Sequence, residues 1–283
     1  MAGSTTGHTT GDARLVCVDY AQIEARVLAW IARETELLDA FASGADVYSQ
    51  FGSEHLYHRP ISKSTPVERD ISKMTVLGCG FGMSHTTFYK QATARGLDID
   101  LDQARAAVAA YRRAYRRIGL LWVSMGIGCD ILVGSRPSSM LFGMKVEAPH
   151  DWLGGKVSSV TMPSGRKIYY GYDSKNKSLF TATRSSLNMW YGLLTENIVQ
   201  ATARDIIRDA MVRIIDRVRH GDYPPELIPV TMTHDDLVFR VRKGTEDRMV
   251  EVICAAMREA PTWAPGLPLD VSVKIGDTYY DIK

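Results

Sequence analysis

Apolar runs in the first and last parts of the chain predict strands. Residues 15–19 (LVCVD) are apolar up to a final aspartate, and two short runs at 229–233 and 237–241 are separated by only three residues, His-Asp-Asp. Runs of this length, with few polar positions, are typical of strands buried in a sheet. A further strand is expected over 269–275, after a helix over 246–259. These runs predict short strands in the first and last parts of the chain.

Between these strands the apolar positions recur at helical spacing. The segment Thr65-Pro66-Val67-Glu68 has the residue types of a helix start, with Thr as N-cap, Pro at the first position and Glu three residues after the cap. That helix ends at the glycines 78, 80 and 82. The other predicted helices cover residues 23–31, a short segment ending near Gly44, 84–95, 101–117 and 184–219.

From Asp130 to Lys175 the pattern changes to short β-like runs (VSSVTM and RKIYYGY), joined by the turn residues Pro163-Ser164-Gly165. Helices and strands in this mixture predict an α/β (mixed α+β) fold.

Composition excludes several classes of protein. The 283 residues are 45% hydrophobic and 23% charged, as in globular proteins. The longest stretch without a charged residue, 74–89, is interrupted by glycines and is shorter than the roughly 20 apolar residues of a membrane span, so no membrane segment is expected. Four scattered cysteines without a C-x-x-C pair argue against zinc and disulfide frameworks. The net charge of +2 indicates neither a nucleic-acid partner nor an acidic one. Residues 1–12 are expected to form a flexible tail.

Acidic residues stand where predicted strands end. Asp19 ends the first strand, and Asp235-Asp236 lie between two later strands. If one sheet brings them together, their carboxylates can hold two Mg²⁺ ions about 3.5–4 Å apart, as in phosphoryl transfer. Aspartate is also common in turns because its side chain bonds nearby amides, and composition alone favours that explanation.

The helix that begins at Thr65 carries Arg69, Lys73 and Leu77 at steps of four, and Phe81 follows at the same step. Such positions form one slowly drifting stripe. Two cations followed by two apolar groups suit a nucleotide, with the triphosphate at the cations and the base and sugar beyond. Taken alone, the stripe is more typical of a solvated helix face.

Three segments together are more specific. DYAQIEAR (residues 19–26) resembles motif A of the family A, DNA polymerase I-like, DNA polymerases. The segment from Arg69 to Ser84 is similar to their motif B, the fingers helix, and THDD (residues 233–236) is similar to motif C. All three motifs occur in the family's order, and the segments resemble those of bacteriophage members. The resemblance extends from about residue 13 to the C-terminus.

The resemblance implies a polymerase catalytic centre. Asp19 and Asp235 would be the metal-binding carboxylates, Asp236 an accessory ligand where the family usually has Glu, and Lys73 the general acid for pyrophosphate. The implied cofactor is two Mg²⁺ ions, with Mn²⁺ as an alternative. The implied substrates are deoxynucleoside triphosphates and primer-template DNA.

The same resemblance implies the remaining contacts. Glu24 would close off the ribose 2′ side and favour deoxynucleotides. The implied nucleotide-binding residues are Arg69, Lys73, Leu77, Phe81, Glu24, Gln22 and Tyr20. The implied DNA-binding residues are His234, Gln200 and Arg26.

Some positions depart from the family's pattern. Leu77 stands where many members have Phe or Tyr, and Phe81 replaces the usual Tyr. Gly192 and Glu196 stand where a more typical member has Arg and Asn that contact DNA. Sugar discrimination and those DNA contacts are therefore not carried over.

The resemblance also implies the organisation. We expect the palm of a right-hand polymerase over 13–45 and 184–283, a largely helical fingers insertion over 46–183, and no thumb. A second polypeptide that supplies the thumb, and that can also carry a 3′–5′ exonuclease, is expected. The location would be cytoplasmic, in the host cytoplasm if the chain is of phage origin.

Two alternatives stay open: a relative of single-subunit RNA polymerases, against which Glu24 argues, and a polymerase-shaped DNA-binding subunit with little turnover of its own. The basic run at residues 112–117 (RRAYRR) fits a phosphate-binding stripe or, more readily, a solvated helix face.

Overall fold

The computed structural model describes residues 12–233 and 235–282, which form two compact units. The first unit draws on the segment up to Ile23, on Arg204–Thr262 and on the segment from Leu269 onward, and the second comprises Glu24–Ala203 and Trp263–Pro268. Residues 24–45 and 184–203, expected in the palm, lie in the second unit, and the palm and fingers boundaries stay a prediction. Most of the predicted tail lies outside the described residues. Among the described helices, none is both long and apolar enough to cross a bilayer.

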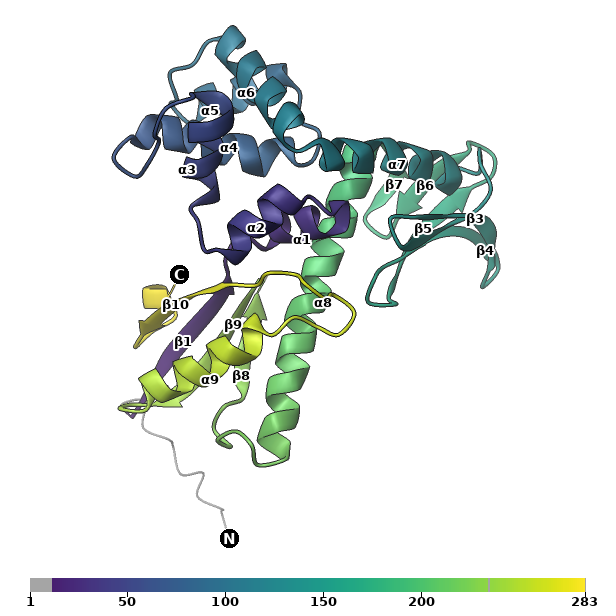
Figure 1. The fold of residues 1–283 in the computed structure, drawn as a ribbon. Coiled ribbons are helices and arrows are strands. Elements are labelled where there is room, and N and C mark those ends of the chain that lie inside the picture. Colours follow the sequence, from purple (N-terminus) through teal and green to yellow (C-terminus); the bar gives the residue numbers. More distant parts are fainter. Residues whose placement is uncertain (1–11, 234, 283) are drawn as a thin grey trace. The chain divides into compact units, whose positions relative to one another are not determined.

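The first unit is built on a four-stranded antiparallel sheet in the order β10-β1-β9-β8 (Figure 1). The bounds of its elements are β1 Ala13–Tyr20, β8 Pro229–Thr233, β9 Asp236–Arg242, α9 Glu246–Arg258, β10 Val271–Gly276 and the short helix η2 Tyr280–Ile282. Each strand and helix predicted here is present, within two residues of its expected ends. The chain therefore brings its first predicted strand between two strands that lie more than 200 residues later.

The two faces of this sheet differ. Successive side chains of a strand point to opposite faces, so Val16, Val18 and Tyr20 share one face of β1. That face lies against α9, whose Met257 is fully buried, and Tyr20 donates a hydrogen bond from its hydroxyl to the Met257 carbonyl at 2.8 Å. Cys17 and Asp19 therefore occupy the other face, where Ile282 of η2 packs against Cys17.

The second unit is helical in its first part. Its helices are α1 Ile23–Ala32, of which all but the first residue belongs to this unit, α2 Thr35–Ala42, α3 Val47–Phe51, the π-helix η1 Gly52–Leu56, α4 Pro66–Cys79, α5 His85–Ala94, α6 Leu101–Ala114 and α7 Arg116–Leu132. Thr65 is the N-cap of α4 and Pro66 its first residue, as predicted. The capping hydrogen bonds are not made, because the Thr65 hydroxyl donates instead to the Ser62 carbonyl and Glu68 pairs with Arg59.

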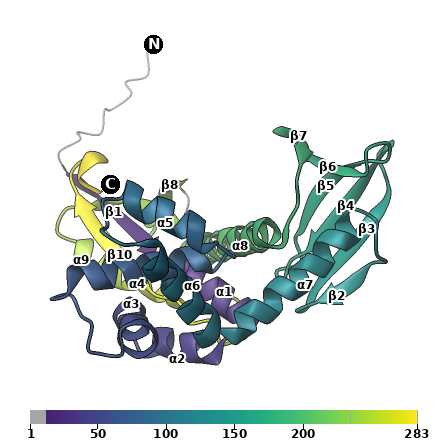
Figure 2. The same ribbon diagram turned by 90° about the horizontal axis from the view of Figure 1, so that it is seen from above.

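A six-stranded antiparallel sheet in the order β2-β3-β4-β5-β6-β7 completes the second unit. Its strands are β2 Ser139–Leu141, β3 Met144–Trp152, β4 Gly155–Thr161, β5 Lys167–Asp173, β6 Ser178–Thr181 and β7 Arg184–Leu187. Helix α7 lies along one face of this sheet (Figure 2), and the Ser158 hydroxyl donates to the Leu132 carbonyl there. The region expected to be largely helical thus contains a full sheet.

The expected helix over 184–219 is wrong at its beginning. Residues 184–187 pair with β6 as strand β7, and the helix α8 spans Tyr191–Arg219. Its first residues, up to Ala203, belong to the second unit and the rest to the first. The mixed α/β fold predicted from the sequence is otherwise confirmed.

Candidate functional site

Three aspartates meet at one end of the first unit's sheet. Asp19, near the end of β1, lies directly opposite Asp236 of β9 on one side and Ser272 of β10 on the other. The Tyr20 amide donates to the Asp235 carbonyl at 3.2 Å, which places Asp235 beside the same strand end. The sequence expectation that the two acidic segments are brought together is met.

The strand alternation fixes which way these groups point. Tyr20 is only 2% exposed and its hydroxyl is held on the α9 face, where burial raises its pKa well above the ordinary value. Asp19, its neighbour, must therefore lie on the opposite face with Asp236. The side chain of Tyr20 is not available for a nucleotide, and only its backbone lies near the carboxylates.

Asp19 and Asp236 line a cavity of about 200 Å³, together with Cys17, Ser272, Lys274 and Ile282. Residues opposed in an antiparallel pair have Cα atoms about 4.5–5.5 Å apart, so two carboxylates on one face can share a cation. Their hard oxygen atoms suit Mg²⁺ or Mn²⁺. The donor set therefore fits a divalent metal ion.

In the second unit, Arg69 and Lys73 lie on one face of α4. The Arg69 guanidinium is 5.6 Å and the Lys73 ammonium 6.0 Å from the centre of the Tyr48 ring, and Arg69 Nε donates to Asp46 Oδ2 at 2.7 Å. Burial alone would raise the pKa of Asp46, but hydrogen bonds from Arg69 and Ser49 outweigh it and lower that pKa. Asp46 and Tyr48 thus hold the two cations side by side.

The apolar end of the predicted stripe is also present. Leu77 is 37% exposed, and Phe81 lies in the turn that follows α4. This turn is packed against the first turn of α8 with no room for side chains: a Cβ on Gly82 would lie 2.6 Å from the Tyr191 ring, and one on Gly192 would lie 2.4 Å from the Phe81 carbonyl oxygen. Gly192 therefore permits this close approach.

Glu24 and Gln200 also come together within the second unit. The Gln200 side-chain amide donates to Glu24 Oε1 at 3.3 Å and lies 3.4 Å from Glu196 Oε1. The first turn of α1 is thereby connected to α8. The predicted sugar-gating residue and the predicted minor-groove residue form one polar group.

Two other predicted contacts are placed differently. Arg26 is 4% exposed, donates to the Pro268 carbonyl at 3.0 Å and stacks over the Phe41 ring at 4.5 Å, so it stabilises the interior and does not face DNA. Gln22 adopts a left-handed backbone conformation (φ 50°) in the turn before α1. His234 lies outside the described residues.

Several residues around the stripe were not anticipated. Asp46 and Tyr48 carry no sequence signal for their role, because they lie more than 20 residues before Arg69. Trp122 donates to the Gly80 carbonyl at 3.0 Å, and Arg112, from the basic run, lies over the Trp122 ring and contacts the Met83 carbonyl. Arg112 thus supports the turn after α4, and its neighbour Arg113 is exposed, as on a solvated helix face.

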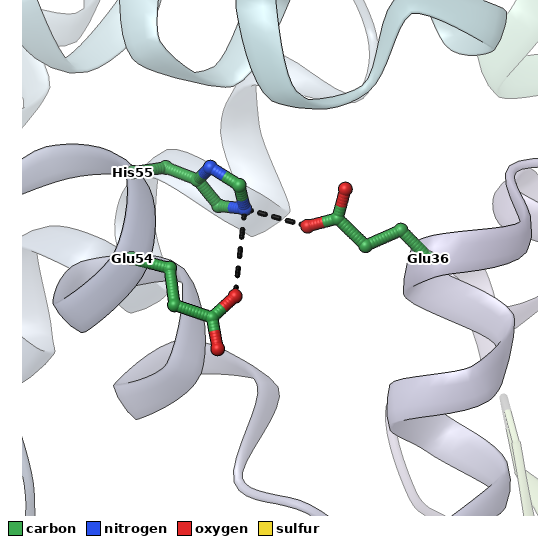
Figure 3. A group of neighbouring side chains, drawn as sticks. All are labelled: Glu36, Glu54 and His55. Atoms are coloured by element: carbon green, nitrogen blue, oxygen red, sulfur yellow. Dashed lines mark hydrogen bonds and ion pairs between the residues drawn. The ribbon is translucent and has the colours of Figure 1, made fainter.

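A further group of side chains with metal-binding atoms lies on α2 and η1 (Figure 3). His55 Nε2 is 2.6 Å from Glu36 Oε1 and 3.9 Å from Glu54 Oε2. From the sequence, His55 has no partner pattern. The short His55–Glu36 hydrogen bond already satisfies the imidazole nitrogen, so we interpret the group as a polar link between α2 and η1.

Acidic residues gathered at the end of an antiparallel sheet, in a chain that also carries an aligned Arg and Lys, are typical of enzymes that transfer phosphoryl groups. The family description "DNA polymerase family A" matches residues 7–281, and the chain belongs to this family. The resemblance inferred from motifs A, B and C is thereby confirmed.

Individual relatives are distant. A DNA polymerase of Bacillus phage SP02 is 27% identical, over 92% of this chain and 40% of the phage protein, and DNA polymerase I of Mycobacterium leprae is 27% identical over 95% and 25%. The POL domain of Pol1 from M. smegmatis, solved in complex with DNA primer-template and dNTP, shares the fold with a TM-score of 0.66 and 21% identity, over 97% of this chain and 41% of that chain. The chain thus spans between 25% and 41% of the length of these relatives.

Proposed function

We propose that this chain is the catalytic core of a template-directed DNA polymerase that adds deoxynucleotides to a primer 3′ end with a two-metal centre. The observation that carries the proposal is the meeting of Asp19, Asp235 and Asp236 at one strand end, with Asp19 directly opposite Asp236. Family membership supports the same conclusion.

The aspartates bind the cofactor in this proposal. Asp19 and Asp235 hold two Mg²⁺ ions and Asp236 is accessory, with Mn²⁺ as an alternative metal. When bound, the ions supply Lewis-acid stabilisation of the charge on the attacking and leaving oxygens. The rigid pairing of β1 with its neighbours positions the carboxylates before substrate arrives.

The α4 stripe binds the incoming nucleotide. The 3′-hydroxyl group loses its proton to water, its oxygen attacks the α-phosphorus, and the bond from that phosphorus to pyrophosphate breaks. Arg69 and Lys73 bind the triphosphate, and Lys73 Nζ gives a proton to the departing pyrophosphate. Because Arg69 is paired with Asp46, its guanidinium is already oriented, which lowers the entropy lost on binding. Leu77 and Phe81 offer apolar surface to the sugar and base.

The Glu24–Gln200 pair contacts the sugar of the incoming nucleotide and the nascent base pair. Glu24 fills the space that a ribose 2′-hydroxyl would need, and the hydrogen bond from Gln200 holds it there. Gln200 and His234 are the proposed DNA contacts. Arg26 is omitted because it is buried.

Primer extension tests the proposal directly. Purified protein with a primed template, deoxynucleotides and Mg²⁺ should extend the primer, and Asp19→Asn should lower the rate by about 10²–10³-fold or more. Asp222→Asn, on an exposed loop of the same unit, is the matched control and should be unchanged. Equal extension by Asp19→Asn and the unaltered protein would contradict the mechanism.

The same assay separates the alternatives. Preferential use of ribonucleotides would favour an RNA polymerase relative, and tight DNA binding without extension would favour a binding subunit. The second polypeptide that supplies a thumb stays a prediction, and the mass of the native complex tests it. A monomer that is fully active at physiological salt would contradict it.

A further inference from the structure

The six-stranded sheet of the second unit has one covered face and one open face. The covered face includes Tyr170, Val160 and Val146, all 1% exposed or less, and lies against α7. The neighbouring side chains point to the open face. They include Tyr169, Ser159 and Glu147, which share one face because the register pairs Tyr169 with Ser159 and Ser159 with Glu147.

The open face carries a pair of stacked aromatic rings. The rings of Trp152 (β3) and Tyr169 (β5) are 4.9 Å apart at their centres and only 1° from parallel. They remain 46% and 44% exposed although they cover each other. Val157, on the same face of the intervening strand β4, is 9% exposed. Two large flat rings are thus held in a fixed orientation with much of their surface in water.

A third aromatic residue extends this surface. Phe180 of β6 is opposite Gly171 of β5, and its ring lies over that glycine so closely that a Cβ there would be 2.2 Å from the ring. Phe180 is 40% exposed. We call Trp152, Tyr169 and Phe180 the aromatic platform.

Two lysines, Lys145 and Lys167, share the open face with the aromatic platform. Residues 139–187 contain seven Lys or Arg and three Asp or Glu, a net charge of +4 in a chain whose total is +2. On the open face, hydrogen bonds from Lys145, Lys167 and Ser159 lower the pKa of Glu147 to about 2. Lys145 and Lys167 both pair with this one carboxylate, so the three groups together keep a net charge of +1 on the open face.

We propose that the aromatic platform binds single-stranded nucleic acid by stacking bases on Trp152, Tyr169 and Phe180, with the surrounding lysines near the phosphates. Exposed aromatic rings combined with basic side chains are the recurring means of binding single strands without sequence preference. Cross-strand aromatic pairs also stabilise sheets, but that role needs neither half-exposed rings nor an excess of positive charge. The inference rests on the proposed function only in taking the strand to be unpaired template.

Binding is measured apart from catalysis. The full chain is titrated against fluorescein-labelled oligo-dT in EDTA, without nucleotide or primer, and followed by anisotropy. Trp152→Leu/Tyr169→Leu should weaken binding by about fivefold or more, since a stacked base of this kind contributes at least that factor. Trp152→Phe/Tyr169→Phe should restore most of it. The matched control is Tyr280→Leu, an aromatic residue 92% exposed in the other unit.

A direct mapping guards against misfolded variants. An oligonucleotide carrying 5-bromodeoxyuridine is photocrosslinked to the unaltered protein, and the peptides are identified by mass spectrometry. Crosslinks in 150–181 support the platform. The proposal would be overturned if the double-Leu variant bound the oligonucleotide within twofold of the unaltered protein. Crosslinks confined to other segments would also overturn it, and the aromatic platform would then be open to a protein partner instead. Because EDTA prevents extension, failure here and failure of the polymerase proposal are separate results.

Discussion

The two sheets have a similar architecture, and they differ in the side chains on the face opposite the packed helix. Each is antiparallel, and each has one face packed against a helix, α9 in the first unit and α7 in the second. The face of the four-stranded sheet opposite α9 carries Asp19 and Asp236 at one strand end, and Ile282 of η2 packs on the same face. The open face of the six-stranded sheet carries aromatic rings and lysines. The two covered faces are alike because both bury apolar surface. A difference in ligand preference between the sheets therefore comes from the opposite faces.

The largest effect should separate covered from open faces. Phe239→Ala, at a fully buried position of β9, should lower the free energy of unfolding by about 3–5 kcal/mol because it leaves a cavity. The same change at Phe180, 40% exposed on the open face of the other sheet, should cost less than about 1 kcal/mol. Urea unfolding followed by circular dichroism measures both. Equal losses would mean that the platform face is packed in solution.

The next effect concerns the carboxylate face alone. Asp235→Asn should lower kcat for primer extension by about 10²–10³-fold. Asp236→Asn should lower it by only about 10- to 100-fold, as expected of an accessory group. Single-turnover extension measures both rates. Since Asp236, and not Asp235, lies opposite Asp19, a reversed order of the two effects would assign the principal metal ligand to Asp236.

A third effect tests the close packing of the turn after α4 against α8 in the second unit. Gly192→Ala should lower the free energy of unfolding by about 1–3 kcal/mol, because its Cβ would collide with the Phe81 carbonyl. The matched control is Gly126→Ala in α7, where a Cβ has nothing within 4 Å. That change should stabilise the helix by about 0.5–1 kcal/mol. Thermal unfolding that shows both variants equal would remove the argument from packing.

The smallest effect is electrostatic and lies on the platform face. Glu147→Gln should lower the free energy of unfolding at pH 7 by about 0.5–1 kcal/mol. Folding lowers the pKa of Glu147 from 4.5 to about 2, so its contribution is complete above pH 4.5 and is lost as the pH falls toward 2. The melting temperatures of the two proteins should therefore converge over this range. A constant difference from pH 7 to pH 2.5 would contradict the ion-pair origin.

Local patterns in the sequence predict elements of both units. The apolar run 15–19 lies inside β1, and Thr65 and Pro66 mark the start of α4. Such signals are local, since they depend on burial and on the few residues around a helix end. The strand β7 was missed because its pairing with β6, and not its own Ser-rich sequence, makes it a strand.

The candidate site was predictable in composition but not in detail. Strand ends indicate that Asp19 and Asp235-Asp236 meet, yet a shift of one residue decides which of the two faces Asp19. Asp46 and Tyr48 act through contacts across the fold that no spacing encodes. Arg26 was expected to contact DNA from the family resemblance, but it is buried, a rare state for a charged residue, and a carbonyl and an aromatic ring are its partners.

The hydrogen bond from Tyr20 to Met257 has a consequence for how β1 tolerates change. A slip of β1 by one residue would exchange its two faces, so that Asp19 would enter the apolar side against α9 and Tyr20 would take its place beside Asp236. The buried Tyr20 side chain therefore stabilises the observed register of β1 over a shifted one. An insertion or deletion between residues 13 and 20 should therefore abolish activity even where every aspartate is retained, whereas conservative substitutions in the same strand need not.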